Sequence, residues 1–147
     1  MNELPDETRG WLEALGFAVA DEALWGEALT HGSTGAAPTY DRLEFLGDRV
    51  LGLAIAEWLY RHDGGPEGEL AQRLNALVSR TTCARIAREI GAPGQVRLGK
   101  QARDDGGQDS ENILCDVMEA LLGASFLESG FSATREVIHA LWDDAMH

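Results

Sequence analysis

The sequence predicts an all-α fold. Over several stretches, apolar residues recur at intervals of three and four, which is the spacing of an amphipathic helix. No stretch alternates apolar and polar residues as a half-buried strand does, and no internal repeat is present. With 147 residues, of which 44% are hydrophobic, the chain can bury one ordinary core. We therefore expect a single domain over residues 1–147.

The first half of the chain contains three predicted helices. The first covers about residues 5–16 and ends at a glycine. A second begins near Asp21 and runs to the segment GSTGAAPT, whose composition is that of a loop. The longest helical pattern covers about residues 40–61, and we expect it to be the central helix.

The second half continues the helical pattern after the break HDGGPEG. Helices are predicted at about 69–78 and 81–90, and GAPG ends the latter. Residues 99–112 are polar and contain three glycines, which indicates a surface loop. An apolar helix follows from about Ile113, and the last helix is expected at about 132–145.

Two groups of acidic residues lie within apolar helical stretches. Asp41, Glu44 and Asp48 are spaced three and four residues apart and so share one helix face. Asp116 and Glu119 share a face in the same way. Solvated helix faces explain most of the 25 acidic residues. These two groups are different, because carboxylates next to a packed core need a partner, and we interpret them as two walls of one metal site.

The carboxylate oxygens limit which metal ion can bind and which reaction it can support. Oxygen ligands favour Mg²⁺ or Mn²⁺, whereas zinc favours nitrogen and sulfur. Several carboxylates can hold two ions about 3.5–4 Å apart for an in-line phosphoryl displacement. The sequence contains no Walker-type phosphate loop and no serine or cysteine arrangement for covalent catalysis. Metal-dependent phosphoryl chemistry is the expectation.

Charge, cysteines and hydropathy set further bounds. The net charge is −13, with only 12 lysine and arginine residues, so nucleic-acid binding would need cations in the acidic site and would be salt-sensitive. Cys83 and Cys115 lie far apart in sequence and are expected to be reduced and buried. No apolar run reaches the roughly 18–20 residues of a membrane span, and the first residues do not form a signal sequence. We expect a cytoplasmic protein without a membrane partner.

Several segments together resemble the ribonuclease III family, whose members are endonucleases that cut double-stranded RNA. The segment DRLEFLGDRVL at 41–51 is similar to the nine-residue signature of that family. Other matching segments are ALTHGS at 28–33, EGELAQRLNALVSRTTCARIAREIG at 67–91, RLGK at 97–100 and ENILCDVMEALLGASFLESG at 111–130. The resemblance implies the helical bundle of a ribonuclease III endonuclease domain.

The resemblance also implies roles for the acidic residues. Glu44, Asp116 and Glu119 would ligate the catalytic Mg²⁺, for which Mn²⁺ can substitute. Asp48 and Glu119 would be the residues whose loss abolishes cleavage. In the family, a metal-activated water attacks the phosphorus and leaves 5′-phosphate and 3′-hydroxyl ends.

Two further acids are auxiliary candidates by the same resemblance. Asp41 stands where the family usually has glutamate, and Glu67 matches a glutamate that helps to position the substrate. The family works as a homodimer, which would cover apolar residues around Phe45, Leu46 and Trp58. In a bacterial cell it matures ribosomal RNA and processes messenger RNA.

Bacterial relatives commonly continue into a double-stranded-RNA-binding domain, whereas this sequence stops at DDAMH, after the last predicted helix. We expect no such domain in this chain; either the sequence is part of a longer protein or the domain acts alone. Two other functions stay open. One is an all-α metal-dependent nucleotide pyrophosphohydrolase, which uses similar carboxylate spacing. The other is a non-catalytic ribonuclease-III-like RNA-binding module, which typically lacks the acids that are present here.

Overall fold

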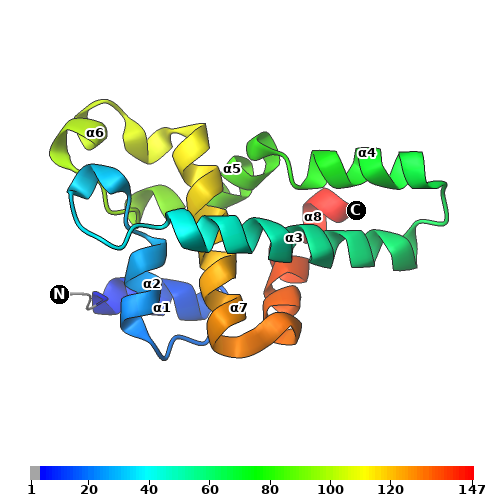
Figure 1. Cartoon of the computed structure of the whole chain (residues 1–147), viewed down its shortest axis with the longest axis horizontal. Coiled ribbons are helices and arrows are strands. Elements are labelled where there is room, and N and C mark those ends of the chain that lie inside the picture. Colours follow the sequence, from blue (N-terminus) through cyan, green and yellow to red (C-terminus); the bar gives the residue numbers. More distant parts are fainter. Residues whose placement is uncertain (1–3) are drawn as a thin grey trace.

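The structure, a computed structural model, describes residues 4–147 as helices joined by short connections (Figure 1). The α-helices are α1 (Asp6–Ala14), α2 (Glu22–Ala28), α3 (Asp41–His62), α4 (Glu67–Leu77), α5 (Arg80–Glu89), α6 (Lys100–Asp104), α7 (Glu111–Leu141) and α8 (Asp143–Met146). Short 3-10 turns cover Gly32–Thr34, Ala92–Gly94 and Gly107–Asp109. Among the described residues, one parallel bridge between Thr30 and Arg97 is the only β-type pairing. The predicted all-α class is confirmed.

Side-chain caps explain where several helices begin. Asp21, Ser79 and Ser110 precede α2, α5 and α7, and each accepts a hydrogen bond from the backbone N–H three residues further on. Such a cap satisfies an amide that has no partner within the helix. The cap at Ser110 matters most for function, because it sets the start of the helix that carries Asp116 and Glu119.

The central helix is α7, not α3 as the sequence predicted. Every residue from Leu114 to Ser125 is buried except the half-buried Asp116. By contrast, α3 keeps an exposed face that includes Phe45, Leu53 and Tyr60. Figure 1 shows α3 lying across the first part of α7, with α4 running back beside α3. The near-continuous apolar run in α7 is therefore that of a helix covered on all sides.

Two sequence predictions of the second half need correction. The segment 99–112, predicted as a loop, contains the helix α6, where Arg103 donates a hydrogen bond to the carbonyl oxygen of Val96. The predicted last helix is the second part of α7, which ends at Leu141 rather than near 145. Gly130 separates the two parts with φ 86° and ψ 176°, a non-helical conformation that glycine adopts easily, and the chain reverses direction there (Figure 1).

Two glutamates that the sequence suggested were merely solvated have structural roles. Glu128 accepts hydrogen bonds from the backbone amides of Ala20 and Asp21 and from the indole of Trp25. It thereby ties the connection before α2 to α7. Glu57 on α3 pairs with an arginine of the second part of α7. Both carboxylates link segments that are far apart in sequence.

Three of the four tryptophans belong to the core, and Trp11 is partly buried against it. Trp25 and Trp142 are fully buried, and the indole of Trp142 donates to the carbonyl oxygen of Leu77 at 2.8 Å. Trp58 is also buried, so it cannot contribute to an exposed dimer surface as the sequence suggested. Among residues 4–147, no helix combines the length and the apolarity that crossing a membrane requires.

Candidate metal centre

The site is built where α3 and α7 cross at two glycines. A Cβ atom placed on Gly47 would overlap the carbonyl oxygen of Glu119 and lie 2.9 Å from the amide nitrogen of Gly123. A Cβ atom on Gly123 would overlap the carbonyl oxygen of Leu43. The two helix backbones are thus in direct contact, which only glycine permits at these positions. This contact fixes how the side chains one turn away from each glycine face one another.

Three carboxylates converge beside this crossing. Glu44 lies one turn before Gly47 on α3, and Glu119 lies one turn before Gly123 on α7. With Asp116, they offer oxygen atoms that all lie within 4.8 Å of one another. The structure therefore brings together the three residues that the resemblance assigns as metal ligands.

Burial makes this cluster costly without a cation. Glu119 is only 6% exposed, and burial, with a hydrogen bond to Asp48 and nearby negative charges, raises its pKa to about 10. Burial also raises the pKa of Glu44 and of Asp116; neighbouring carboxylates raise that of Glu44 further, whereas the hydrogen bond from Tyr40 and the charge of Arg80 offset part of the rise at Asp116. An ionised cluster of this kind needs positive charge close by.

Two neighbours that the sequence did not suggest complete the site. The hydroxyl of Tyr40 donates to Oδ2 of Asp116 at 3.3 Å, and burial raises the pKa of Tyr40, which keeps that proton in place. Nη1 of Arg80, at the start of α5, lies 3.8 Å from Oδ1 of Asp116. Neither residue lies in either acidic group. Their one sequence signal is position, because Tyr40 comes directly before α3 and Arg80 directly after a cap.

The donor set fits a small, hard divalent cation. All three side chains offer oxygen, the ligand type of Mg²⁺ and Mn²⁺. Oxygen atoms around an octahedral Mg²⁺ at 2.0–2.1 Å lie roughly 3–4 Å apart, so ligand atoms within 4.8 Å need to contract only slightly. Glu44, Asp116 and Glu119 could therefore hold such an ion, with Tyr40 fixing the orientation of Asp116.

The other predicted site residues lie outside this group of three. Asp48 is half-buried, hydrogen-bonds with Glu119, and accepts from Nη1 of Arg49 at 2.6 Å. Asp41 is exposed at the first residue of α3 and acts on Glu44 and Asp116 only through its charge.

Glu67 lies in a different environment from the other predicted site residues. It is exposed at the first residue of α4 and lines a separate groove with Tyr60 and Leu70. The structure thus places Asp48 beside the carboxylate cluster, Asp41 at its edge and Glu67 in another environment.

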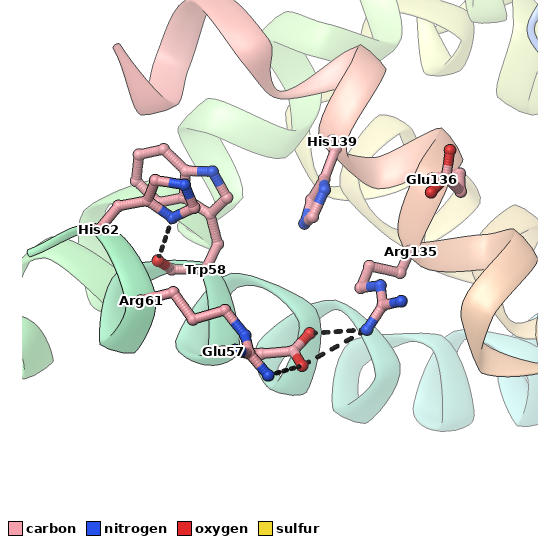
Figure 2. A pocket seen from close by; sticks show the side chains of 7 residues that line it. All are labelled: Glu57, Trp58, Arg61, His62, Arg135, Glu136 and His139. Atoms are coloured by element: carbon pink, nitrogen blue, oxygen red, sulfur yellow. Dashed lines mark hydrogen bonds and ion pairs between the residues drawn. The ribbon is translucent and has the colours of Figure 1, made fainter.

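A second charged hollow, of about 310 Å³, lies between the C-terminal part of α3 and the second part of α7 (Figure 2). Its arginines are already paired: Nη1 of Arg135 lies 3.1 Å from Glu57, and Nη2 of Arg61 lies 3.3 Å from the same carboxylate. Figure 2 shows both guanidinium groups directed to Glu57. Nε2 of His139 is buried there without a hydrogen-bond partner. This hollow does not gather the acidic groups predicted from the sequence.

The fold and the carboxylate cluster define an all-α protein with a candidate divalent-metal centre at a helix crossing. Residues 21–144 match the family model described as Ribonuclease-III-like, and the chain belongs to this family. The predicted family resemblance is confirmed.

Curated relatives agree with this assignment. The chain is 57% identical over 134 residues to Ribonuclease 3 of Zymomonas mobilis, covering 90% of this chain and 54% of the relative. It is 43% identical over 144 residues to Ribonuclease 3 of Thermobifida fusca, covering 95% of this chain and 60% of the relative. The chain thus spans little more than half the length of these relatives.

Two solved structures superpose on this chain along nearly the whole length of both chains. The nuclease domain of ribonuclease III from Campylobacter jejuni superposes with a TM-score of 0.89 at 29% identity, covering 96% of this chain and 97% of that one. A second structure of that domain, described as flexible in a region involved in dimer formation, gives a TM-score of 0.87 at 32% identity and covers 91% and 94%. The matched part of the family is therefore its nuclease domain.

Proposed function

We propose that residues 1–147 form a single endonuclease domain that cleaves double-stranded RNA with the help of Mg²⁺, for which Mn²⁺ can substitute. The observation that carries the proposal is the convergence of Glu44, Asp116 and Glu119 within 4.8 Å in a chain of the Ribonuclease-III-like family. The proposed substrates are paired regions of RNA, including ribosomal RNA precursors and messenger RNAs. The products carry 5′-phosphate and 3′-hydroxyl ends.

The chemistry divides between the ion and the side chains. Bound Mg²⁺ supplies Lewis-acid polarisation of the phosphate and activation of a water molecule. Glu44, Asp116 and Glu119 hold the ion, and Tyr40 keeps Asp116 oriented through its 3.3 Å hydrogen bond. Asp48 hydrogen-bonds with Glu119, so it can orient that carboxylate. This contact supports its role as a residue required for cleavage.

Substrate binding depends on the same cation. A chain with a net charge of −13 repels a polyanionic duplex, and Glu44, Asp116 and Glu119 gather three acidic groups in one place. Held by Glu44, Asp116 and Glu119, a divalent ion would offset this repulsion and supply positive charge for a phosphate. Mg²⁺ is therefore required for engagement of RNA as well as for the reaction.

A homodimer is the second part of the proposal. Phe45 and Leu127 are 60% and 58% exposed, although both are large and apolar. They line one hollow of about 750 Å³ together with Leu24, Pro38 and Leu46. In a two-fold dimer the same patch serves both subunits, so Phe45 of one copy can fill the hollow of the other. Arg49, which lies over the Phe45 ring at 4.7 Å, borders this surface.

Three substrates in parallel test the proposed activity. The protein is incubated with an end-labelled RNA duplex, with the matching single strand and with a nucleoside triphosphate, in Mg²⁺ or in EDTA. We expect cleavage of the duplex alone, loss of cleavage in EDTA, and loss of cleavage in Glu119→Ala. The matched control is Glu136→Gln, because Glu136 is exposed on the same helix and is expected to leave cleavage unchanged.

Each alternative function has its own outcome in this assay. Hydrolysis of the triphosphate without cleavage of the duplex supports a nucleotide pyrophosphohydrolase. Binding of the duplex without any Mg²⁺-dependent cleavage supports a non-catalytic module. Either result contradicts the proposal.

A further inference from the structure

A second group of metal-binding side chains shares Glu119 with the carboxylate cluster. Cys83 on α5 and Cys115 on α7 are both buried free thiols. Their sulfur atoms and a carboxylate oxygen of Glu119 all lie within 4.8 Å of one another. The two cysteines lack metal-like spacing in the sequence, because the packing of α5 against α7 is what brings Cys83 to this place.

Helix geometry holds two of the three ligands on one face. Cys115 and Glu119 are four residues apart on α7, so their side chains point the same way. Sγ of Cys115 lies 3.7 Å from Oε1 of Glu119. Cys83 approaches this pair from the neighbouring helix, which closes a three-sided pocket of two sulfurs and one oxygen.

These separations match a thiophilic ion better than Mg²⁺. Around a tetrahedral Zn²⁺, with Zn–S about 2.3 Å and Zn–O about 2.0 Å, a sulfur and an oxygen lie roughly 3.5 Å apart and two sulfurs roughly 3.8 Å apart. The observed 3.7 Å is close to the first value, and the 4.8 Å limit of the group needs at most a small contraction. Sulfur ligands favour zinc over magnesium.

We propose that Cys83, Cys115 and Glu119 form a binding site for Zn²⁺, separate from the Mg²⁺ cluster but sharing one ligand with it. A water molecule completes the tetrahedron, and the two thiol protons are released to solvent as the thiolates bind. Glu119 joins these buried ligands to the half-buried Glu44 and Asp116.

Occupation of this site changes the function of Glu119. Zn²⁺ bound to the two sulfurs competes with the Mg²⁺ cluster for the carboxylate of Glu119. If the proposed nuclease function holds, Zn²⁺ therefore inhibits cleavage by withdrawing Glu119. The binding itself does not depend on the nuclease function and can be measured without RNA.

The test uses Cd²⁺ as a spectroscopic probe and Zn²⁺ as the competing ion. The reduced chain is titrated with Cd²⁺, and the ultraviolet absorption of cadmium bound to thiolate is recorded. We expect the absorption to saturate at one equivalent and to disappear when Zn²⁺ is added. Cys115→Ala is expected to abolish most of it, and Cys83→Ala tests the same site if that variant does not fold. Glu119→Gln is expected to weaken binding by at least about tenfold, the loss that even outer ligands can cause.

Controls separate this site from the Mg²⁺ cluster. Glu44→Gln removes a ligand of the cluster only, and it is expected to keep the thiolate absorption. Absence of that absorption in the folded wild-type chain, or its persistence in the double variant Cys83→Ala/Cys115→Ala, overturns the proposal. In the cleavage assay, each Cys→Ala variant is expected to need at least about tenfold more Zn²⁺ for half-inhibition, relative to its own activity without zinc. If all variants are equally sensitive to Zn²⁺, the inhibitory role is contradicted. The binding site itself is then judged by the Cd²⁺ titration.

Discussion

Glu119 is the residue on which the site depends most. It is buried against α3, it belongs to the carboxylate cluster, and it hydrogen-bonds with Asp48. Without a cation its pKa is about 10, so it carries a proton at neutral pH. Binding of a divalent ion must displace that proton, which couples metal affinity to pH.

The first prediction concerns stability of the metal-free protein. The folded-state pKa of Glu119, about 10, lies above its ordinary value of 4.5. The folded state therefore holds the proton more tightly than the unfolded state does, and its advantage is complete below pH 4.5 and is lost as the pH rises through 10. We expect the free energy of unfolding in EDTA to decrease between about pH 5 and pH 9. Urea denaturation at several pH values measures it.

Glu119→Gln is the matching substitution, because glutamine is neutral at every pH. In EDTA at pH 8 the wild type must take up a proton on Glu119 when it folds, whereas glutamine needs none, so the variant is expected to be more stable by roughly 1–3 kcal/mol. The decrease in stability with pH should also become smaller. Glu136→Gln serves as the control, since Glu136 is exposed on the same helix. An identical pH dependence in Glu119→Gln and wild type would contradict this account of Glu119.

At the scale of elements, the crossing of α3 and α7 determines the site. Glycine normally weakens a helix, yet Gly47 and Gly123 lie inside two long ones. Their backbones touch, and the touching turns carry the acidic side chains. The site geometry is therefore set by the absence of two side chains as much as by the presence of carboxylates.

The second prediction tests this crossing with Gly47→Ala. The added methyl group would overlap the carbonyl oxygen of Glu119, which is backbone and cannot rotate away. We expect the helices to separate, the free energy of unfolding to fall by about 3 kcal/mol, and metal affinity to decrease. Thermal denaturation and a Mn²⁺ titration measure the two effects.

Gly52→Ala is the control on the same helix. A Cβ atom there has no neighbour within 4 Å, so the substitution should be neutral or stabilise the helix by about 0.5–1 kcal/mol. If both variants behave alike, the close approach at Gly47 is not what fixes the site.

The sequence predicted these elements unevenly. Periodicity located α3 to within a residue or two, and the starts of α2 and α5 lie within one residue of those expected. The sequence did not predict α6, which is polar. This helix is stabilised by a hydrogen bond from Arg103 to the carbonyl oxygen of Val96, which lies before the helix. The sequence also placed the central helix wrongly, because periodicity reports one buried face and not how many neighbours cover a helix.

The same distinction applies to the site. Spacing within a helix predicted which acids share a face, and family resemblance assigned their roles. The contribution of Tyr40 and Arg80 depends on the packing of α3 and α5 against α7, which no local pattern encodes. The glycines carried a signal, since an interior glycine in an apolar helix often marks close packing. No feature of the sequence indicated that Cys83 lies close to Glu119.

At the scale of the whole molecule, charge opposes RNA binding. The third prediction is that duplex cleavage by this chain is sensitive to salt, because few arginines must make the phosphate contacts of a chain with net charge −13. Raising KCl from about 50 to 200 mM should lower the single-turnover rate roughly tenfold, as expected for about two phosphate contacts. Rates that are equal at both salt concentrations, with Mg²⁺ held constant, would count against this electrostatic account.

The fourth prediction concerns assembly. Phe45→Asp places a charge on the exposed apolar patch beside the 750 Å³ hollow, so we expect the proposed dimer to dissociate. Sedimentation velocity at micromolar concentration should give a dimer for the wild type and a monomer for the variant. Tyr60→Asp is the control, because Tyr60 is 81% exposed on the same helix but lines a different groove. A wild-type chain that sediments as a monomer and still cleaves fully contradicts the dimer.

We propose that the carboxylates brought together by the glycine crossing bind the divalent ion. Anomalous diffraction from crystals of the chain grown with Mn²⁺ tests it most directly, because manganese is located without reference to activity. We predict an anomalous peak within coordination distance of Glu44, Asp116 and Glu119, and its loss in Glu119→Gln. A peak elsewhere at saturating Mn²⁺, with these three carboxylates not in contact with an ion, would contradict it.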